Sequence, residues 1–221
     1  MKVLSIRTAR AIWVVPLVNI NPYGRSIFEA ASALVKRYGF LKPPETQSLI
    51  ASPLSIKFEA GTFSGDDGIP KIVNLAVHDD GLVVDTRSST EDSDQFLDDA
   101  LNWLASEFKL VGPRDLGVSK RYVSEVSIRF ENPIEVFNDR FSSFARSLRS
   151  GTGPNQPKPM ELINLNFGTD PEAGATPRLL RIEREIGTPF SEDRYFSSAA
   201  IQTREHLKLL HEFELAASSS N

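Results

Sequence analysis

The chain has 221 residues, of which 40% are hydrophobic and 24% are charged, a composition typical of folded globular proteins that excludes disordered, collagen-like and coiled-coil chains. Its formal net charge of −4 disfavours general binding to nucleic acid or to an anionic membrane. The absence of cysteine excludes disulfides, thiolate metal sites and a cysteine nucleophile.

The N-terminal stretch from Val3 to Val18 is rich in β-forming residues and predicts a strand. Its apolar part, Ala11 to Val18, follows basic residues but is short and contains Pro16, so we interpret it as a strand instead of a signal peptide. No run approaches the roughly 18 uninterrupted apolar residues of a membrane span. We therefore expect a cytoplasmic protein without a membrane association.

The first helix is predicted to begin at Asn21-Pro22, because Asn caps helices and Pro is tolerated at the first helical position. Apolar residues recur at helical spacing from Ile27 to Tyr38. Gly39 then stands where a left-handed residue would end the helix.

Alternating apolar and polar residues predict the next strands, at 54–60 and 73–77. The turn sequence at 78–81, His-Asp-Asp-Gly, predicts a hairpin to a third strand at 82–84. A second helix is predicted at 88–108, because Ser and Thr followed by acidic residues are typical of a helix start and an apolar stripe follows.

A Gly- and Pro-containing connector is predicted at 111–119, after which the pattern begins again. The elements predicted for this second half are a strand at 122–130, a helix from Asn132-Pro133 to Leu148, a loop at 151–159, strands at 160–167, 179–186 and 195–199, and a last helix capped by Thr203.

These elements predict an α+β fold of antiparallel sheets, each covered by helices. The first half is 1–110 and the second is 120–217, followed by a frayed tail at 218–221. Both halves share the order strand, helix, strands, helix, and their Asn-Pro pairs lie 111 residues apart. We therefore predict an internal duplication with pseudo-twofold symmetry, the two halves packing as one unit; coincidence is the alternative.

Most catalytic and metal signatures are absent from the sequence. His206 and His211 are separated by about 140° around a helix, so they do not face one metal, and His78 lies beside a turn. The Gly151-Thr152-Gly153 sequence matches neither a dinucleotide fingerprint nor a P-loop. The many aspartates between residues 79 and 99 lack a calcium-loop pattern and suit helix starts and turns. We therefore expect no metal and no cofactor.

Two polar groups are the candidate contacts for a ligand or partner. The first is Arg87, Ser88, Ser89 and Thr90, and the second is Tyr195, Ser197, Ser198, Thr203 and His206. The first group could bind an anion at a helix start, with simple capping as the alternative. The second could line a pocket or meet a partner, with a packed edge strand as the alternative.

The predicted function is a non-enzymatic protein–protein interaction or assembly module, which could self-associate. The evidence is mainly the missing chemistry, together with wide apolar arcs on the helices that carry Phe137 and Leu207. The alternative is a small-molecule binding protein or hydrolase with an unconventional pocket between the two halves. A third possibility, a saddle-like nucleic-acid binder, is opposed by the negative charge.

Overall fold

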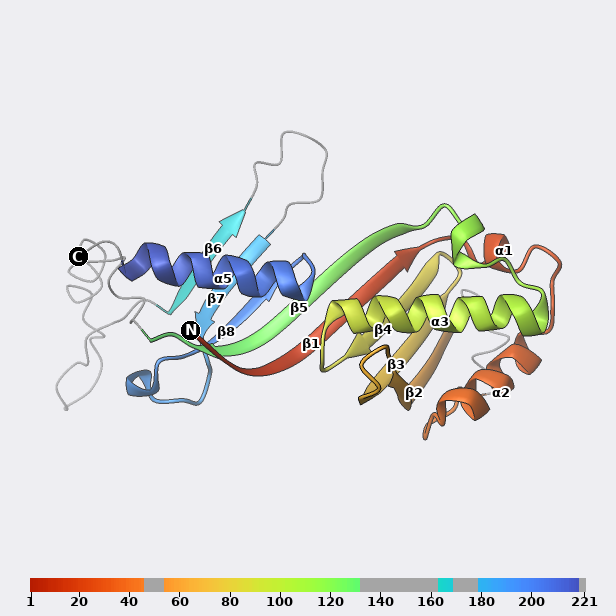
Figure 1. Ribbon diagram of the computed structural model, residues 1–221, viewed down its shortest axis with the longest axis horizontal. Coiled ribbons are helices and arrows are strands. Elements are labelled where there is room, and N and C mark those ends of the chain that lie inside the picture. The colour runs from red at the N-terminus through yellow and green to blue at the C-terminus, as the bar shows by residue number, and fades with distance from the viewer. Residues whose placement is uncertain (46–53, 132–162, 169–178, 219–221) are drawn as a thin grey trace, which may run out of the picture. The chain divides into compact units, whose positions relative to one another are not determined.

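The computed structural model describes residues 1–45, 54–131, 163–168 and 179–218. Eight strands form one sheet in the order β2-β3-β4-β1-β5-β8-β7-β6 (Figure 1). With its helices this makes a mixed α/β protein built on antiparallel strand pairs, which confirms the predicted combination of helices with antiparallel strands.

The chain divides into two compact units. Unit 1 is Met1–Ser5, Glu125–Ala199 and Arg204–Asn221, and unit 2 is Ile6–Ser124 and Ala200–Thr203.

The predicted N-terminal strand is β1 (Lys2–Val14), which ends four residues earlier than expected. Pro16 has a φ of −58° and precedes the short helix α1 (Leu17–Ile20). Because proline fixes φ and lacks an amide hydrogen, it suits this change from strand to helix. The end of the predicted strand was therefore wrong.

The helix α2 (Ile27–Tyr38) begins five residues after the predicted start at Pro22. Ser26 is its N-cap and accepts a hydrogen bond from the Glu29 amide. Asn21 instead closes the preceding loop, since its side chain accepts from the Arg25 amide at 2.8 Å and donates to the Arg25 carbonyl at 2.9 Å. The predicted end is confirmed, because Gly39 has a left-handed φ of 61°.

The strands β2 (Ser55–Ser64), β3 (Pro70–His78) and β4 (Gly81–Thr86) form an antiparallel meander, and β4 also pairs with β1. The predicted hairpin is confirmed: His78 pairs with Gly81, which leaves Asp79 and Asp80 as the two turn residues. A Cβ at Gly81 would lie 2.5 Å from the Trp13 carbonyl oxygen. The glycine is therefore required by close backbone packing against β1.

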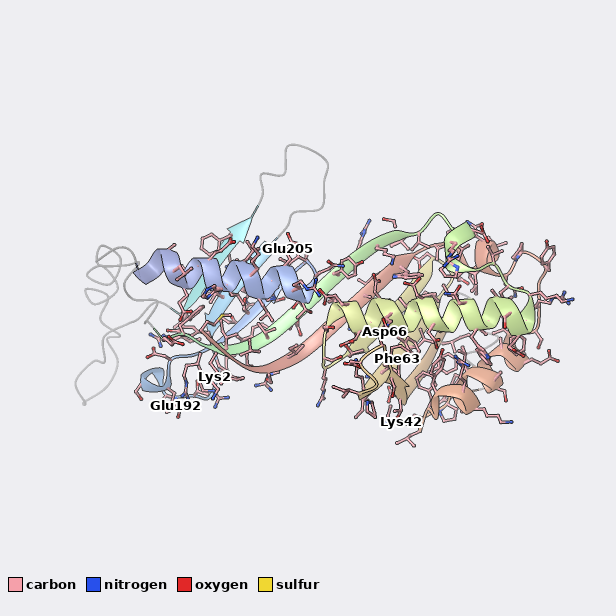
Figure 2. The ribbon with its side chains drawn as sticks, in the orientation of Figure 1. Lys2, Lys42, Phe63, Asp66, Glu192 and Glu205 are labelled. Carbon is pink, nitrogen blue, oxygen red and sulfur yellow. The ribbon has the colours of Figure 1, made fainter. Side chains whose placement is uncertain are left out.

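Helix α3 (Thr90–Phe108) confirms the second predicted helix and supplies much of the unit 2 core. Figure 1 shows it crossing β3 and β4. Phe96 on this helix lies at the centre of an aromatic group, 5.5 Å from the Phe63 ring and 4.8 Å from the Tyr38 ring. Figure 2 labels Phe63 beside the first half of α3.

The predicted connector contains a 3₁₀ turn, Pro113–Asp115, and leads into β5 (Ser119–Arg129). The helix predicted at 132–148 and the loop predicted at 151–159 lie outside the described residues.

Unit 1 contains β6 (Asn164–Gly168), β7 (Leu179–Arg184), β8 (Arg194–Ala199) and α5 (Thr203–Ser218), with a 3₁₀ turn at Phe190–Glu192. Strand β7 ends two residues before the predicted boundary. The core of this unit contains an aromatic group: the Phe130 ring lies 5.3 Å from the Tyr195 ring and 5.7 Å from the Phe213 ring. On α5, Leu210 is completely buried. The polar residue His206, one helical turn before it, is also buried.

Candidate functional site

The serines and threonine before α3 form a helix cap. Ser89 has an extended backbone, and its Oγ accepts a hydrogen bond from the Asp92 amide at 3.0 Å. Ser88 Oγ donates to Thr86 Oγ1 at 3.3 Å. Burial opposes the ionisation of Asp92, but hydrogen bonds from Lys71 and the two serines outweigh it and hold the pKa of this carboxyl below its ordinary value.

Thr90 and Thr203, the first residues of α3 and α5, bind each other reciprocally. The Thr90 amide donates to Thr203 Oγ1 at 3.1 Å, and the Thr203 amide donates to Thr90 Oγ1 at 2.7 Å. Both residues are buried. Since the first amides of a helix have no partner within the helix, each threonine satisfies a donor that burial would otherwise leave unpaired.

These bonds bear on the predicted anion site, because such a site uses the amides at a helix start. The Thr90 amide is taken by Thr203 and the Asp92 amide by Ser89. Arg87 is exposed next to this cap. An anion contact at this guanidinium stays a prediction, and the capping alternative accounts for the serine.

Ser197 on β8 and His206 on α5 form a completely buried pair, with 2.9 Å between Oγ and Nε2. Ser197 Oγ also lies 2.7 Å from the Arg181 carbonyl oxygen, which can only accept. The single hydroxyl proton therefore goes to the carbonyl, and His206 donates from Nε2. Burial lowers the pKa of His206 to about 4, so the ring is neutral at pH 7.

This direction of donation is the reverse of what a nucleophilic serine needs, because a catalytic histidine accepts the hydroxyl proton. Neither atom is exposed to a substrate. The geometry is that of a buried polar link between β8 and α5.

The other two predicted residues of this group lie on β8. Tyr195 is buried and packs against Phe130. The Arg184 guanidinium carbon lies 5.4 Å from the centre of the Tyr195 ring. Ser198 is half-buried and lies opposite Arg181 on β7. The predicted residues are thus brought together in two places: Ser88, Ser89, Thr90 and Thr203 near one another in unit 2, and Tyr195, Ser197 and His206 in unit 1.

A polar cluster around Asp94 in unit 2 was not predicted. Asp94 accepts three hydrogen bonds: from Trp13 Nε1 at 2.6 Å, from Tyr122 Oη at 2.8 Å and from Lys120 Nζ at 3.0 Å. The Lys120 ammonium also lies 4.2 Å from the centre of the Trp13 ring. Burial, and then the bond to Asp94, raise the pKa of Tyr122 to about 12. The carboxylate thus ties α3 to β1 and β5.

A second acidic contact on α3 has the same character. Asp99 accepts from Tyr38 Oη at 2.6 Å and from Arg37, whose guanidinium lies 4.9 Å from the Trp103 ring. Aspartates that we interpreted as helix-start and turn residues therefore also join α3 to its neighbours. No local sequence signal identifies such partners, because they are up to 81 residues away.

An apolar cavity of about 80 Å³, partly open to solvent, lies in unit 2. Its wall is formed by α1, α2, α3 and the strands β2, β3 and β4, and it carries three polar residues, Asn21, Arg25 and Ser26, next to the start of α2. Sequence periodicity does not predict such a cavity, because it depends on how the faces meet.

Within the described ranges, no three histidine or carboxylate side chains converge in a way that could hold a metal ion. In the same part of the chain, no helix combines the length and the apolar character that a membrane span requires. Comparison of the chain with models of known protein families found no match, and neither did comparison with curated proteins.

Proposed function

We propose that this protein is a non-enzymatic protein–protein interaction or assembly module. The observation that carries the proposal is that three large apolar side chains are exposed on the segment that runs from α1 to the first turn of α2. Val18 is 68% exposed, Tyr23 75% and Phe28 45%. Aromatic residues are enriched at the centres of protein interfaces, where they supply most of the binding energy.

The polar clusters support the same proposal because their side chains are used in contacts within the fold. The Asp94 carboxylate, the Thr90–Thr203 pair and the Ser197–His206 pair are each engaged in contacts that join elements of the fold. Groups used in this way hold the structure together, whereas the exposed 18–28 segment carries apolar groups that a partner could bury.

The test is affinity purification of the tagged protein from its native cell, with mass spectrometry of what co-purifies and light scattering of the product. Wild-type protein should yield a stoichiometric partner or a discrete oligomer. Tyr23→Ser should weaken that complex more than tenfold, because a central tyrosine is commonly worth about 2 kcal/mol or more.

The matched control is Ile186→Ser, which replaces a side chain that is 93% exposed in unit 1 and should leave the complex intact. Surface substitutions of this kind change stability by about 0.5 kcal/mol or less, so both variants should fold. A monomer without any stoichiometric partner contradicts the proposal. If Tyr23→Ser and Phe28→Ser both leave the complex unchanged, the 18–28 segment is not its interface.

A second candidate function is the binding of a small molecule, and the unit 2 cavity is the observation that favours it. The cavity lies within one unit; the pocket predicted between the two halves stays a prediction. A ligand that binds the folded state raises the melting temperature by mass action, so a thermal-shift screen separates the two candidates.

We also propose that the chain is a duplicated strand–helix–strands–helix unit. Exchanging β1 with β5, β2 with β6, β3 with β7 and β4 with β8 leaves the strand order the same when read from the other end. Strand β8 follows β4 by the same 113 residues that separate Thr90 from Thr203. The reciprocal bonds of these two threonines have the form expected of equivalent residues that meet.

A further inference from the structure

The cavity in unit 2 has an almost wholly apolar surface. Its apolar walls are aliphatic apart from Phe58, and Ile56, Leu82 and Leu101 among them are buried core residues. The three polar lining residues contribute only a small part of the surface. A group that fills this space therefore meets hydrocarbon on nearly every side.

Two of the three polar side chains are already engaged at the start of α2. The Asn21 side chain bonds both the amide and the carbonyl of Arg25, and Ser26 Oγ accepts from the Glu29 amide. A water molecule inside a protein needs two to four polar partners to be held firmly. The walls described here offer few such partners, so an apolar group that displaces water from them gains affinity.

The volume limits the size of that group. An engineered apolar cavity of about 150 Å³ holds one benzene ring. In proportion, a cavity of about 80 Å³ holds a group of roughly three to four carbons. Because the cavity is partly open to solvent, a larger molecule can leave its other atoms outside. A terminal propyl, butyl or isobutyl group fits these limits.

We infer that this cavity binds the aliphatic end of a small molecule, a terminal alkyl group of about three to four carbons, with the polar part of the ligand in the solvent at the open side. The inference rests on the second candidate function, small-molecule binding, and names the chemical group that is recognised. Recognition depends on the size of the alkyl group and not on the charge of the ligand.

The test is a titration of the full chain with 1-alkanols from ethanol to 1-octanol, followed by NMR of the methyl groups of Ile56, Leu82 and Leu101. Each CH₂ that enters the cavity should lower the Kd about fourfold, which corresponds to the free energy of transferring a CH₂ out of water. Beyond about four carbons the gain should fall below about twofold per CH₂, because the added atoms stay in solvent.

Three probes with the same alkyl chain test the position of the polar end: 1-butanol, butanoate and butylammonium. Their Kd values should agree within about fivefold, which is the range for an exposed charge pair. A charge drawn in among the apolar side chains would weaken binding far more than that, because it would lose its hydration without gaining a partner.

Two variants change the size of the cavity in opposite directions. Ala30→Leu fills it from a half-buried position on α2 and should abolish the methyl shifts caused by 1-butanol. Val77→Ala removes carbons from the β3 wall and should extend the fourfold gain by about one to two carbons. The matched control is Ala33→Leu on α2, outside the cavity lining, which should bind every alkanol like the wild type.

A fourfold gain that continues unchanged to 1-octanol, or charged probes that differ from 1-butanol by much more than fivefold, overturns the inference but leaves the cavity as a ligand site. Absence of shifts at the cavity methyl groups with every probe, or shifts that Ala30→Leu retains, also overturns the inference. The thermal-shift screen then decides the second candidate function separately: a ligand that raises the melting temperature keeps it, and a screen without one removes it.

Discussion

We predict that Asp94→Ala lowers the free energy of unfolding by about 2–5 kcal/mol. Trp13 is 1% exposed, so loss of the acceptor leaves its indole N–H buried and unpaired, which costs about 1–3 kcal/mol. The bonds from Tyr122 and Lys120 are less buried and add about 0.5–1 kcal/mol each at most.

The assay is urea denaturation followed by tryptophan fluorescence, in a Trp103→Phe background that leaves Trp13 as the single reporter among the two tryptophans. Asp94→Asn keeps an acceptor for the indole and should cost less than Asp94→Ala. The control is Asp66→Ala, at an exposed position labelled in Figure 2, which should change stability by about 0.5 kcal/mol or less. If Asp94→Ala costs no more than Asp66→Ala, the structural role assigned to this carboxylate is refuted.

The remaining predictions concern buried polar and backbone contacts. The His206 pKa is about 4 in the folded protein and about 6.5 when unfolded, so the unfolded state binds the proton first. Stability should therefore be complete above pH 6.5 and fall by about 3 kcal/mol as the pH drops to 4; urea unfolding against pH checks this, and His206→Gln should flatten the profile. Gly81→Ala should cost about 1–3 kcal/mol, because its Cβ would meet the Trp13 carbonyl oxygen, and thermal unfolding measures the loss. Thr203→Val keeps the shape but leaves the buried Thr90 amide without its acceptor, which should cost about 1–3 kcal/mol by the same measurement.

Each of these predictions has a result that contradicts it. An unchanged stability of the wild type between pH 6.5 and 4 would show that the histidine is not held neutral. Wild-type stability of Gly81→Ala would mean that β1 can move away from β4 at no cost. A neutral Thr203→Val would show that the Thr90 amide finds another partner.

Local signals predicted the elements whose boundaries depend on nearby residues. The start of α3 follows from the Ser89 cap and the end of α2 from Gly39, because capping bonds and a left-handed φ are decided within a few residues. The start of α2 was mispredicted because Asn21 caps a loop and Ser26 caps the helix; both residue types favour either role.

The contacts that define the candidate sites could not be predicted, because they depend on tertiary packing. The sequence identified Ser197 and His206 as polar residues of interest, but the direction of proton donation between them follows from the position of the Arg181 carbonyl. The Asp94 cluster and the cavity likewise require side chains from strands and helices that are distant in the chain.

The most direct test of the proposed interaction role is hydrogen–deuterium exchange of the purified complex, compared with the isolated protein. If the 18–28 segment is the interface, its amides should be protected in the complex, while those of the exposed residues Ile186 and Gly187 exchange at the same rate in both samples. Protection confined to other segments, with exchange at 18–28 unchanged, would contradict the account.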